Sequence, residues 1–402
     1  MTEHLALDGV RVLDLTQVMA GPFCTMILAD LGADVVKIEP PGTGDLTRRM
    51  GGAHMKMKGP DNAPFFALNR NKRSVVFDLK DDVDRDHFYP LVRSADIVIE
   101  NFRPGVTKKL GIDYGTLAKI KPDLIYASIS GFGQTGPYAD RPGFDLIAQA
   151  MSGVMSVTGE PGGNPVKCGI PISDLGAGLY CAVAILAAFI HRSRTGQGQY
   201  VETSLLDAAV ALSVWETSEL WATGDTPRPF GSAHRLNAPY QAFKTSDGHL
   251  VLAAITERQW RQLCDVIGRP NLADDERFAT NPARMANLAA LTQELEEALS
   301  GESTADWVEK LLAADVPAAP IHDYRQVFDD PHTRARQMVL ELDHPVEGPV
   351  RTLGFPYKLS ETPARPRRPP PRLGEHTEEV LREMGLVAAG APAESDRQRR
   401  SP

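Results

Sequence analysis

Cysteine is scarce in this sequence: the 402-residue chain has four, and no two of them form a Cys-x-x-Cys pair. They are Cys24, Cys168, Cys181 and Cys264. Disulfide scaffolds and cysteine-based zinc sites both need closely spaced cysteines, so the spacing argues against both. Scattered cysteines are typical of a reducing compartment, and we expect a cytoplasmic protein.

Signals for secretion or membrane insertion are also missing. The first residues, Met1–His4, lack the basic flank and apolar run of a signal peptide. The longest apolar stretch, Leu175–Ile190, contains small residues and is short for a bilayer span, which needs about 20 apolar residues. We interpret it as a buried helix and expect no membrane association.

Positive charge is in the minority. Lysine and arginine number 43 against 52 aspartates and glutamates, which gives a net charge of −9. Broad binding of nucleic acid needs a dominant basic surface, so we expect no nucleic-acid partner. An anionic ligand would have to be held by a local cluster of positive groups.

Several sequence motifs of common enzyme classes are absent. There is no GxxxxGK[ST] phosphate loop, no GxSxG nucleophile elbow and no HExxH metal motif among the ten histidines. The first strand is followed by Gln17–Pro22 rather than by GxGxxG, which argues against a dinucleotide cofactor and a reductase. We therefore expect no metal and no tightly bound cofactor, and chemistry based on carboxylates, amides and main-chain groups.

The first half of the chain alternates short apolar strands with helices. We predict strands at Val10–Leu15, Val35–Ile38, Ser74–Leu79, Asp96–Glu100, Leu124–Ile129 and Tyr200–Ser204. We predict helices at Phe23–Leu31, His87–Arg93, Tyr114–Ile120, Asp174–His191 and 205–222. Buried strands separated by helices indicate parallel β-α-β units, so the fold class is α/β with a Rossmann-like sheet.

The second half differs in composition. A chain of this length is too long to fold around a single hydrophobic core, so we expect two domains. The segment Gly224–Pro229 is typical of a linker between them. Beyond it we predict a strand at Leu250–Ala254 and amphipathic helices at Glu257–Ile267, Leu288–Leu299 and Thr304–Ala313. The proline-rich run Arg365–Pro371 predicts an extended segment, and the last dozen residues are expected to fray.

Asp174 stands at the start of the longest apolar helix. Pro171 disfavours helix before it, so the Asp174 carboxylate is expected at a helix N-terminus, where the ionised form is favoured by about 0.3–1 kcal/mol. Taken alone, an ordinary N-cap explains this position. Gly176 and Gly178 each cost about 1 kcal/mol inside a helix relative to alanine, so packing or a ligand must compensate.

Several further motifs recur in a fixed order. They are Leu7–Asp14, Ala20–Pro22, Leu31–Glu39, Asn69–Ser74, Glu100–Gly105, Arg194–Gln199 and Leu373–Thr377. Together with the Asp174 segment, and from about residue 6 to 386, they resemble the family III CoA-transferases, or CaiB/BaiF family. Each motif is weak alone, and the ordered set is specific.

The resemblance implies a mechanism. The family aspartate that matches Asp174 attacks the thioester of an acyl-CoA donor and forms a mixed anhydride. Coenzyme A then forms an aspartyl thioester, which exchanges with the acceptor acid. The implied substrates are an acyl-CoA donor and a carboxylic acid acceptor. The glycines after Asp174 are candidates for leaving main-chain donors open to an oxyanion.

The resemblance and the positive charges near strand ends also indicate where coenzyme A binds. We expect contacts from Met19, Ala20, Asn71, Lys72, Arg73, Asn101, Phe102, Arg103, Lys109, Phe144 and Asp145. The charged groups among them are expected on loops at strand ends, where α/β sheets bind ligands, with solvated surface charge as the alternative. Pro40 stands where formyl-CoA transferases have a contacting arginine, so that contact is in doubt.

Racemases of the family are the first alternative. They carry a Gly-His-Asp triplet in which the histidine is one of two bases, whereas this chain has Gly143-Phe144-Asp145. Phenylalanine cannot carry a proton, which favours the transferase. Asp145 stays a candidate acid near Asp174, with a surface or capping carboxylate as the alternative. A catalytically silent CoA-binding protein is a further alternative, against which the intact Asp174 counts.

The acceptor acid is less defined. The stretch Gly231–Phe243 lacks the glycine run of formyl-CoA transferases and resembles transferases that use succinyl-CoA and dicarboxylic acids. His234 and Arg235 are candidates for binding a distal carboxylate, with polar contacts between domains as the alternative. The resemblance implies a large Rossmann-like domain at 1–224, a small inserted α+β domain at 225–320, a returning segment at 321–402, and an interlocked homodimer.

Overall fold

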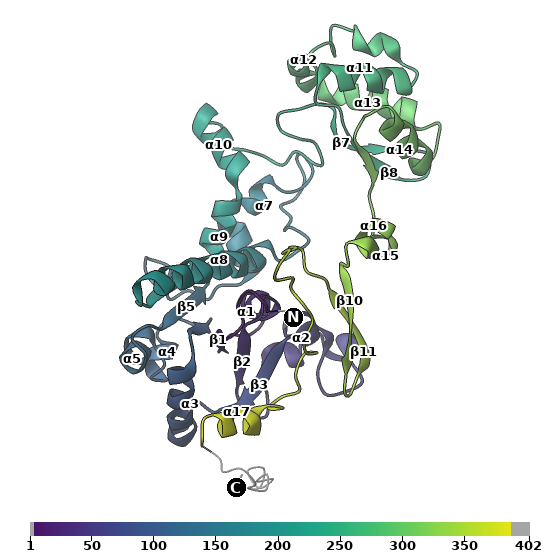
Figure 1. The fold of residues 1–402 in the computed structure, drawn as a ribbon. Helices are drawn as coiled ribbons and strands as arrows, with labels where there is room; N and C mark the ends of the chain where they lie inside the picture. Colours follow the sequence, from purple (N-terminus) through teal and green to yellow (C-terminus); the bar gives the residue numbers. More distant parts are fainter. Residues whose placement is uncertain (1–3, 387–402) are drawn as a thin grey trace. The chain divides into compact units, whose positions relative to one another are not determined.

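The chain folds into two compact units in the computed structural model, which describes residues 4–386 (Figure 1). Of the described residues, those up to Val154, Cys168–Val214 and those from His332 onward form the first unit. The second unit consists of Met155–Lys167 and Trp215–Pro331. The predicted small domain, 225–320, lies wholly within the second unit. The last dozen residues, for which fraying was predicted, lie outside the described residues.

A parallel sheet is the centre of the first unit. Its strands are β1 (Arg11–Asp14), β2 (Asp34–Glu39), β3 (Lys72–Val76), β4 (Ile97–Glu100), β5 (Ile125–Ser130) and β6 (Gln199–Ser204). They lie in the order β3-β2-β1-β4-β5-β6, and every neighbouring pair is parallel. The α/β fold class and the Rossmann-like sheet are thus confirmed. The chain reverses direction across the sheet between β1 and β4.

The strands are apolar because both faces of the sheet are covered. Alternate side chains of a strand point to opposite faces, and β1 shows this with Val12 in one buried cluster and Leu13 in another. The Val12 face is covered by α1 (Ala20–Asp30) and α8 (Ile172–Thr195). The Leu13 face is covered by α3 (Asp82–Ser94), α5 (Tyr114–Ile120) and α17 (Thr377–Glu383).

The rest of the first unit is shorter helices and one hairpin. Its other helices are α2 (Ala63–Leu68), α4 (Val106–Lys109), α6 (Asp145–Met151) and α9 (Leu205–Leu212). β10 (Val339–His344) and β11 (Gly348–Leu353) form an antiparallel pair. The single helix predicted over 205–222 is wrong, because the helix is interrupted at Ser213 and continues as α10 (Val214–Thr223).

The predicted buried helix at 174–191 is α8. Among residues 4–386 it is the one helix long and apolar enough to cross a bilayer. One side of it, including Ala177, Cys181 and Ile185, is fully buried against the sheet. The opposite side exposes apolar residues, among them Leu179, Val183 and Ile190.

The proline-rich segment near the C-terminus covers the free edge of β3. The run 365–371 contains no helix or strand, as predicted. The Asn71 amide donates to the Arg368 carbonyl at 3.0 Å, and the His376 amide donates to the Ser74 carbonyl at 2.9 Å. The Val76 amide donates to Thr377 Oγ1 at 3.0 Å. Main-chain groups of Asn71, Ser74 and Val76 on this edge therefore have partners in the C-terminal segment.

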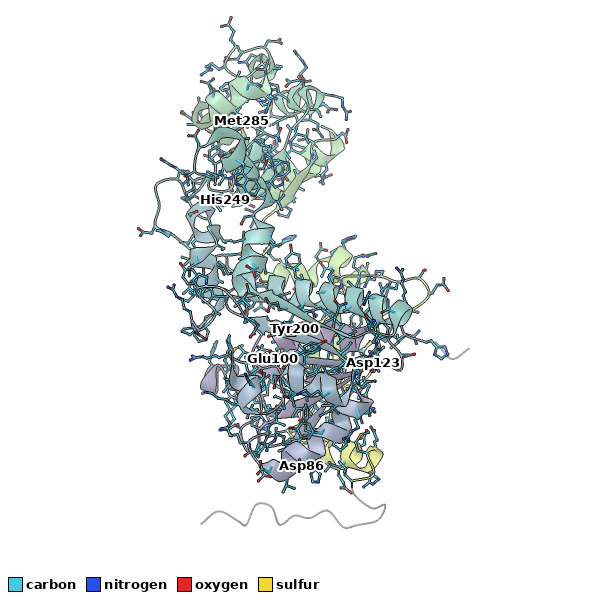
Figure 2. The ribbon with its side chains drawn as sticks, turned by 90° about the vertical axis from the view of Figure 1, so that its left-hand side faces the viewer. Asp86, Glu100, Asp123, Tyr200, His249 and Met285 are labelled. Carbon is cyan, nitrogen blue, oxygen red and sulfur yellow. The ribbon has the colours of Figure 1, made fainter. Side chains whose placement is uncertain are left out.

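The second unit has its own sheet and core. β7 (Tyr240–Lys244), β8 (His249–Ala253) and β9 (Ala318–Pro320) pair antiparallel. The helices of this unit are α7 (Val154–Val157), α10, α11 (Glu257–Val266), α12 (Asn281–Ala286), α13 (Leu288–Leu299), α14 (Thr304–Ala313) and α15 (Tyr324–Asp329), whereas α16 (Pro331–Ala335) belongs to the first unit from His332 onward. The buried cluster of the second unit centres on Trp260, Phe243 and Leu295. Each unit thus carries its own side-chain cluster (Figure 2, where Glu100 and Tyr200 mark the first unit and His249 and Met285 the second).

Candidate active site

The main candidate site is a cavity of about 380 Å³ in the first unit. Its walls come from the loops that follow β1, β4 and β5 and from the start of α8. The loops after β1 and β4 leave the sheet in opposite directions, and a crevice opens at such a switch point. This is the position at which open parallel sheets bind ligands.

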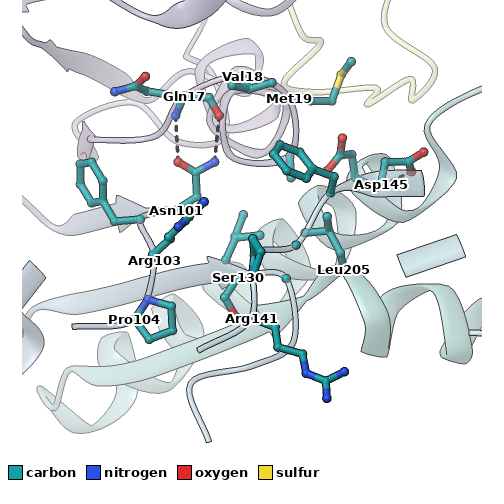
Figure 3. A pocket seen from close by; sticks show the side chains of 18 of the residues that line it. Gln17, Val18, Met19, Asn101, Arg103, Pro104, Ser130, Arg141, Asp145 and Leu205 are labelled. Atoms are coloured by element: carbon teal, nitrogen blue, oxygen red, sulfur yellow. Dashed lines mark hydrogen bonds between the residues drawn. The ribbon is translucent and has the colours of Figure 1, made fainter. Parts of the chain in front are cut away.

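Asn101 joins the two loops at the switch point. Its Oδ1 accepts a hydrogen bond from the Gln17 amide at 2.9 Å, and its Nδ2 donates to the Gln17 carbonyl at 2.8 Å. The two bonds are drawn in Figure 3. The side-chain amide of Asn101 therefore forms the same pair of hydrogen bonds with the main chain of Gln17 that a residue of a neighbouring strand would form.

Asp174 is the third residue of α8. The helix begins at Ile172 after Pro171, two residues earlier than predicted, so Asp174 is not the N-cap. Asp145 caps this helix instead. Its Oδ1 accepts hydrogen bonds from the Ser173 amide at 2.9 Å and the Asp174 amide at 3.4 Å. An N-cap role was considered for both Asp174 and Asp145. The structure shows that Asp145 has it.

Asp145 is itself held by a buried glutamine. Gln149 Nε2 donates to Asp145 Oδ2 at 2.6 Å, and Gln149 Oε1 accepts from the Cys168 amide at 2.8 Å. The Gln149 side chain is fully buried. Hydrogen bonds to both oxygens favour a carboxylate fixed in one orientation.

Burial and the neighbouring charge of Asp145 raise the pKa of Asp174 to about 7. We predicted that the helix N-terminus would favour the ionised form of Asp174. This prediction is wrong, because the effects that raise the pKa outweigh the effect of the helix N-terminus. The helix end contributes only about 0.3–1 kcal/mol, whereas desolvation and a like charge shift a carboxyl pKa by several units. Asp174 is therefore a carboxylate of unusually high basicity.

The two glycines of α8 differ in how closely other segments approach them. A Cβ at Gly178 would lie 2.6 Å from the Ala20 carbonyl oxygen, so the glycine lets α8 approach the start of α1. A Cβ at Gly176 would lie 3.0 Å from Leu212 Cδ1. Both residues are buried inside the helix. Close packing is thus the compensation at Gly178, whereas at Gly176 only side-chain atoms are near.

Most of the predicted residues line this cavity together. They are Met19, Ala20, Asn101, Phe102, Arg103, Phe144, Asp145 and Asp174. Phe144, which stands where racemases have a histidine, is 68% exposed. Residues from four separate segments meet here, as the order of the strands requires.

Lys72 and Arg73 lie elsewhere, and their predicted place on a loop at a strand end is wrong. They begin β3, at the end of the sheet opposite the cavity loops. Lys72 Nζ is buried and lies 3.1 Å from Asp14 Oδ2, while Arg73 pairs with Asp34 at 2.5 Å and Glu383 at 2.6 Å. β3 starts two residues before the predicted strand, which places both charges inside the sheet.

Asn71 and Lys109 do not line the cavity either. Asn71 Oδ1 accepts from the Arg367 and Arg368 amides at 2.5 and 3.0 Å, so this residue holds the C-terminal segment. Lys109 is exposed at the end of α4.

His234 and Arg235 belong to the second unit. The guanidinium of Arg235 lies 3.1 Å from Glu219 and 3.6 Å from Glu216. The His234 ring stacks on Tyr240 with centroids 4.9 Å apart. Both side chains therefore make contacts inside their own unit.

A second cavity of about 230 Å³ adjoins the first through the shared residues Gln17 and Phe102. Its other walls include Pro40, Phe77 and Lys80, at the carboxyl ends of β2 and β3. Lys80 was not singled out from the sequence, although it follows a predicted strand directly. The rule that ligands bind at carboxyl ends of strands, applied to the predicted strand end at Leu79, would have found it.

Arg141 also lines the first cavity and was missed. Its guanidinium lies 3.8 Å from the centroid of the Tyr138 ring, and in Figure 3 the side chain extends away from Met19 and Asp145. Within residues 4–386 no three histidine, cysteine or acidic side chains gather to hold a metal ion.

Comparisons with known proteins agree with one another. The family model for CoA-transferase family III matches residues 7–377. A succinate–glutarate CoA-transferase of Agrobacterium fabrum is 42% identical, over 95% of this chain and 96% of its own length. A succinyl-CoA:mesaconate CoA-transferase of Haloarcula marismortui is 43% identical, over 97% of this chain and 99% of its own. A crystal structure of a CaiB/BaiF family protein from Brucella suis matches with a TM-score of 0.86 and 40% identity, over 94% of this chain and 99% of its own.

Proposed function

The chain belongs to CoA-transferase family III, and from this premise we propose that Asp174 carries the acyl group when coenzyme A moves from succinyl-CoA to a dicarboxylic acid. The chain is an enzyme of the CoA-transferase type. The observation that carries the proposal is Asp174 itself, a carboxyl with a pKa raised to about 7 in a cavity at the switch point of the sheet.

The transfer proceeds in four exchanges at one carboxylate. An Asp174 oxygen attacks the thioester carbonyl carbon of succinyl-CoA, the carbon–sulfur bond breaks, and coenzyme A thiolate leaves a mixed anhydride. The thiolate attacks the Asp174 carbonyl carbon, which releases succinate and forms an aspartyl thioester. The acceptor carboxylate then attacks this thioester and expels the thiolate. Attack of the thiolate on the acceptor acyl carbon releases the new acyl-CoA and restores Asp174.

The surroundings of Asp174 suit this chemistry. A more basic carboxylate is a better nucleophile, and burial together with Asp145 raises its pKa. Since one thioester replaces another, the reaction needs no ATP. This accords with the missing phosphate-loop motif.

The two adjoining cavities support a place for coenzyme A. We assign the thioester end to the larger cavity with Asp174, and the nucleotide end to the smaller one with Lys80. Phe102, which borders both, offers an aromatic surface along the path, and Arg103 offers a positive charge. This assignment replaces the predicted contacts from Lys72 and Arg73.

The acceptor is proposed to be a dicarboxylic acid, because relatives are named for glutarate and mesaconate. His234 and Arg235 remain a prediction for its distal carboxylate. Arg235 pairs with Glu216 and Glu219 in its own unit. To bind the substrate carboxylate it would have to give up one of these ion pairs.

A homodimer is proposed as the working form. Its support is the exposed apolar side of α8, where Leu179, Val183 and Ile190 are 51%, 64% and 51% exposed. Large apolar side chains exposed together on one side of a helix favour contact with another apolar surface. The molar mass in solution, measured by light scattering, tests this; a monomer at micromolar concentration would contradict it.

The function is tested by acyl exchange. Succinyl-CoA is incubated with glutarate, mesaconate and a panel of other acids, and new CoA thioesters are identified by mass spectrometry. Wild type should form them, Asp174→Ala should lose at least about a thousandfold in rate, and Asp123→Ala, which removes an exposed carboxylate paired with Lys121, should retain the activity.

Borohydride reduction during turnover should convert Asp174 to homoserine, which peptide mass spectrometry detects. Absence of exchange from succinyl-, acetyl- and formyl-CoA, with coenzyme A still bound, would overturn the transferase. Deuterium exchange at the α-carbon of branched acyl-CoAs would then test the racemase.

A further inference from the structure

Val18 adopts a backbone conformation that its side chain disfavours. Its φ is 71°, in the left-handed region, where β-branched residues are genuine outliers. Among the described residues, four that are not glycine have positive φ: Val18, Asn71, Asp315 and Gln337. Of these, Val18 lines the cavity that contains Asp174. Backbone strain costs free energy, so neighbouring contacts must maintain it.

Three consecutive residues of this loop are each held by a different side chain. Lys37 Nζ donates to the Thr16 carbonyl at 2.7 Å. Asn101 pairs with both main-chain groups of Gln17. The Val18 amide donates to Asp45 Oδ1 at 3.2 Å. The loop 16–19 therefore has an anchor at each residue before Met19, and Figure 3 shows the central one.

Two of these anchors lie beneath the loop and not in the cavity. The side chains of Lys37 and Asp45 have no exposed surface, and Lys37 Nζ lies 2.9 Å from Asp45 Oδ2. Burial would lower the pKa of Lys37, but Asp14 and Asp45 raise it, so the lysine stays charged. A buried ion pair is seldom needed for stability alone, because apolar residues of similar size often serve equally well.

We propose that Lys37, Asp45 and Asn101 are positioning residues, which hold the loop 16–19 in its strained form so that Gln17, Val18 and Met19 make one wall of the acyl-transfer site. The inference rests on the proposed function, because it takes the cavity with Asp174 as the place of acyl transfer. Lys37 and Asp45 act through the loop and touch no substrate. The strained backbone at Val18 has to be held in place, and this explains why three consecutive residues of the loop are each bound by a different side chain.

The test uses second-site rescue. Lys37→Met and Asn101→Ala are each made alone and together with Val18→Gly in the full-length enzyme, and kcat and KM for succinyl-CoA are measured. Each anchor variant should lose roughly 10- to 100-fold in kcat, the cost of misplacing a reacting group by about 1 Å, while Lys37→Met changes KM little. Adding Val18→Gly should restore part of kcat, since glycine adopts positive φ without steric cost.

Gln337→Gly is the matched control. Gln337 is exposed and also has positive φ, at 54°, so glycine there relieves the same kind of strain away from the cavity. It should not restore kcat in either anchor variant. If Lys37→Met does not fold, Asn101→Ala decides the question.

Two results would overturn the inference: wild-type kcat in folded anchor variants, or equal rescue by Gln337→Gly, which would mean a general gain in stability. Asp174→Ala is assayed alongside. If it is inactive and the anchor variants are fully active, positioning by the loop fails and the proposed function stands. If Asp174→Ala is active, the proposed function and the inference fail together.

Discussion

At the scale of single residues, the site depends on two aspartates with different surroundings. Asp145 accepts hydrogen bonds at both oxygens, from Gln149 and from the first turn of α8. Asp174 lies in the same cavity and has its pKa raised by burial and by Asp145. The arrangement leaves one carboxylate fixed and the other basic, and a basic carboxylate is what the proposed attack on a thioester requires.

The pH dependence follows from this pair. Protonated Asp174 cannot attack a thioester, so log kcat/KM should rise with pH and level off above about 7, the raised pKa of the free enzyme. Asp145→Asn removes the neighbouring charge and should move this inflection to lower pH. Rates of exchange from succinyl-CoA between pH 5 and 9 measure both.

Asp123→Asn, which changes an exposed carboxylate, is the control and should leave the inflection in place. A flat profile between pH 5 and 8 in the wild type would contradict the nucleophilic role of Asp174.

Residues at the site differed in how well they were predicted. Asp174 and Asn101 were singled out because their motifs resemble a family in which those positions act, and both residues line the cavity. Lys72 and Arg73 were misplaced, because a charged residue at a strand boundary is exposed or buried according to where the strand starts. β3 starts two residues earlier than predicted, so both side chains belong to the strand. There they form ion pairs with Asp14 and Asp34, which come from distant parts of the sequence. Such pairs join distant segments and leave no local pattern.

At the scale of elements, the packing of α8 on α1 places Asp174. At Gly178 the two helices lie so close that an added Cβ would be 2.6 Å from the Ala20 carbonyl oxygen. Because this contact involves main chain, it cannot yield as a flexible side chain would.

Alanine at the two glycines should therefore have opposite consequences. Gly178→Ala would put a Cβ 2.6 Å from a carbonyl oxygen, so α8 must shift; we expect a loss of about 1–3 kcal/mol of unfolding free energy and reduced kcat. Gly176→Ala meets the end of the Leu212 side chain at 3.0 Å and Ala208 Cβ at 3.6 Å, and should be neutral or stabilising by up to about 1 kcal/mol. Urea unfolding of both variants measures the difference. Equal stability of the two would refute this account of α8 packing.

Elements with strong patterns were predicted well. Strands β2 and β4 are rich in valine and isoleucine and are buried on both faces, and α11, α13 and α14 show a clear helical period. β7 was missed, since Tyr240–Lys244 follows a polar, loop-like stretch and gains its pairing only from β8. The cavity itself depends on strand order, which brings the ends of β1 and β4 together and is not a local property.

At the scale of the whole molecule, two separate cores carry the stability. The first unit has buried clusters on both faces of its sheet, and the second has one around Trp260. The cavity with Asp174 is lined by residues of the first unit.

A core substitution in the second unit should therefore separate stability from binding. Leu295→Ala removes a fully buried side chain from α13 and should cost about 2–5 kcal/mol in that unit. Calorimetry should show one transition lowered and a second unchanged, while coenzyme A binding measured by titration calorimetry persists. Leu28→Ala, in the core of the first unit, is the control and should lower the other transition. A single unfolding transition whose midpoint is lowered by either substitution would contradict independent cores.

The contact between Ser74 and His376 has a consequence during protein synthesis. The two residues are 302 positions apart, and a ribosome adding about 5–20 residues per second takes roughly 15–60 s to cover that distance. Throughout this time the outer edge of β3 has main-chain groups that await a partner, and open edges recruit other chains. A nascent chain with an incomplete end thus exposes the sheet where it is most prone to aggregate. Premature termination late in the message should yield insoluble protein rather than a slightly shortened enzyme.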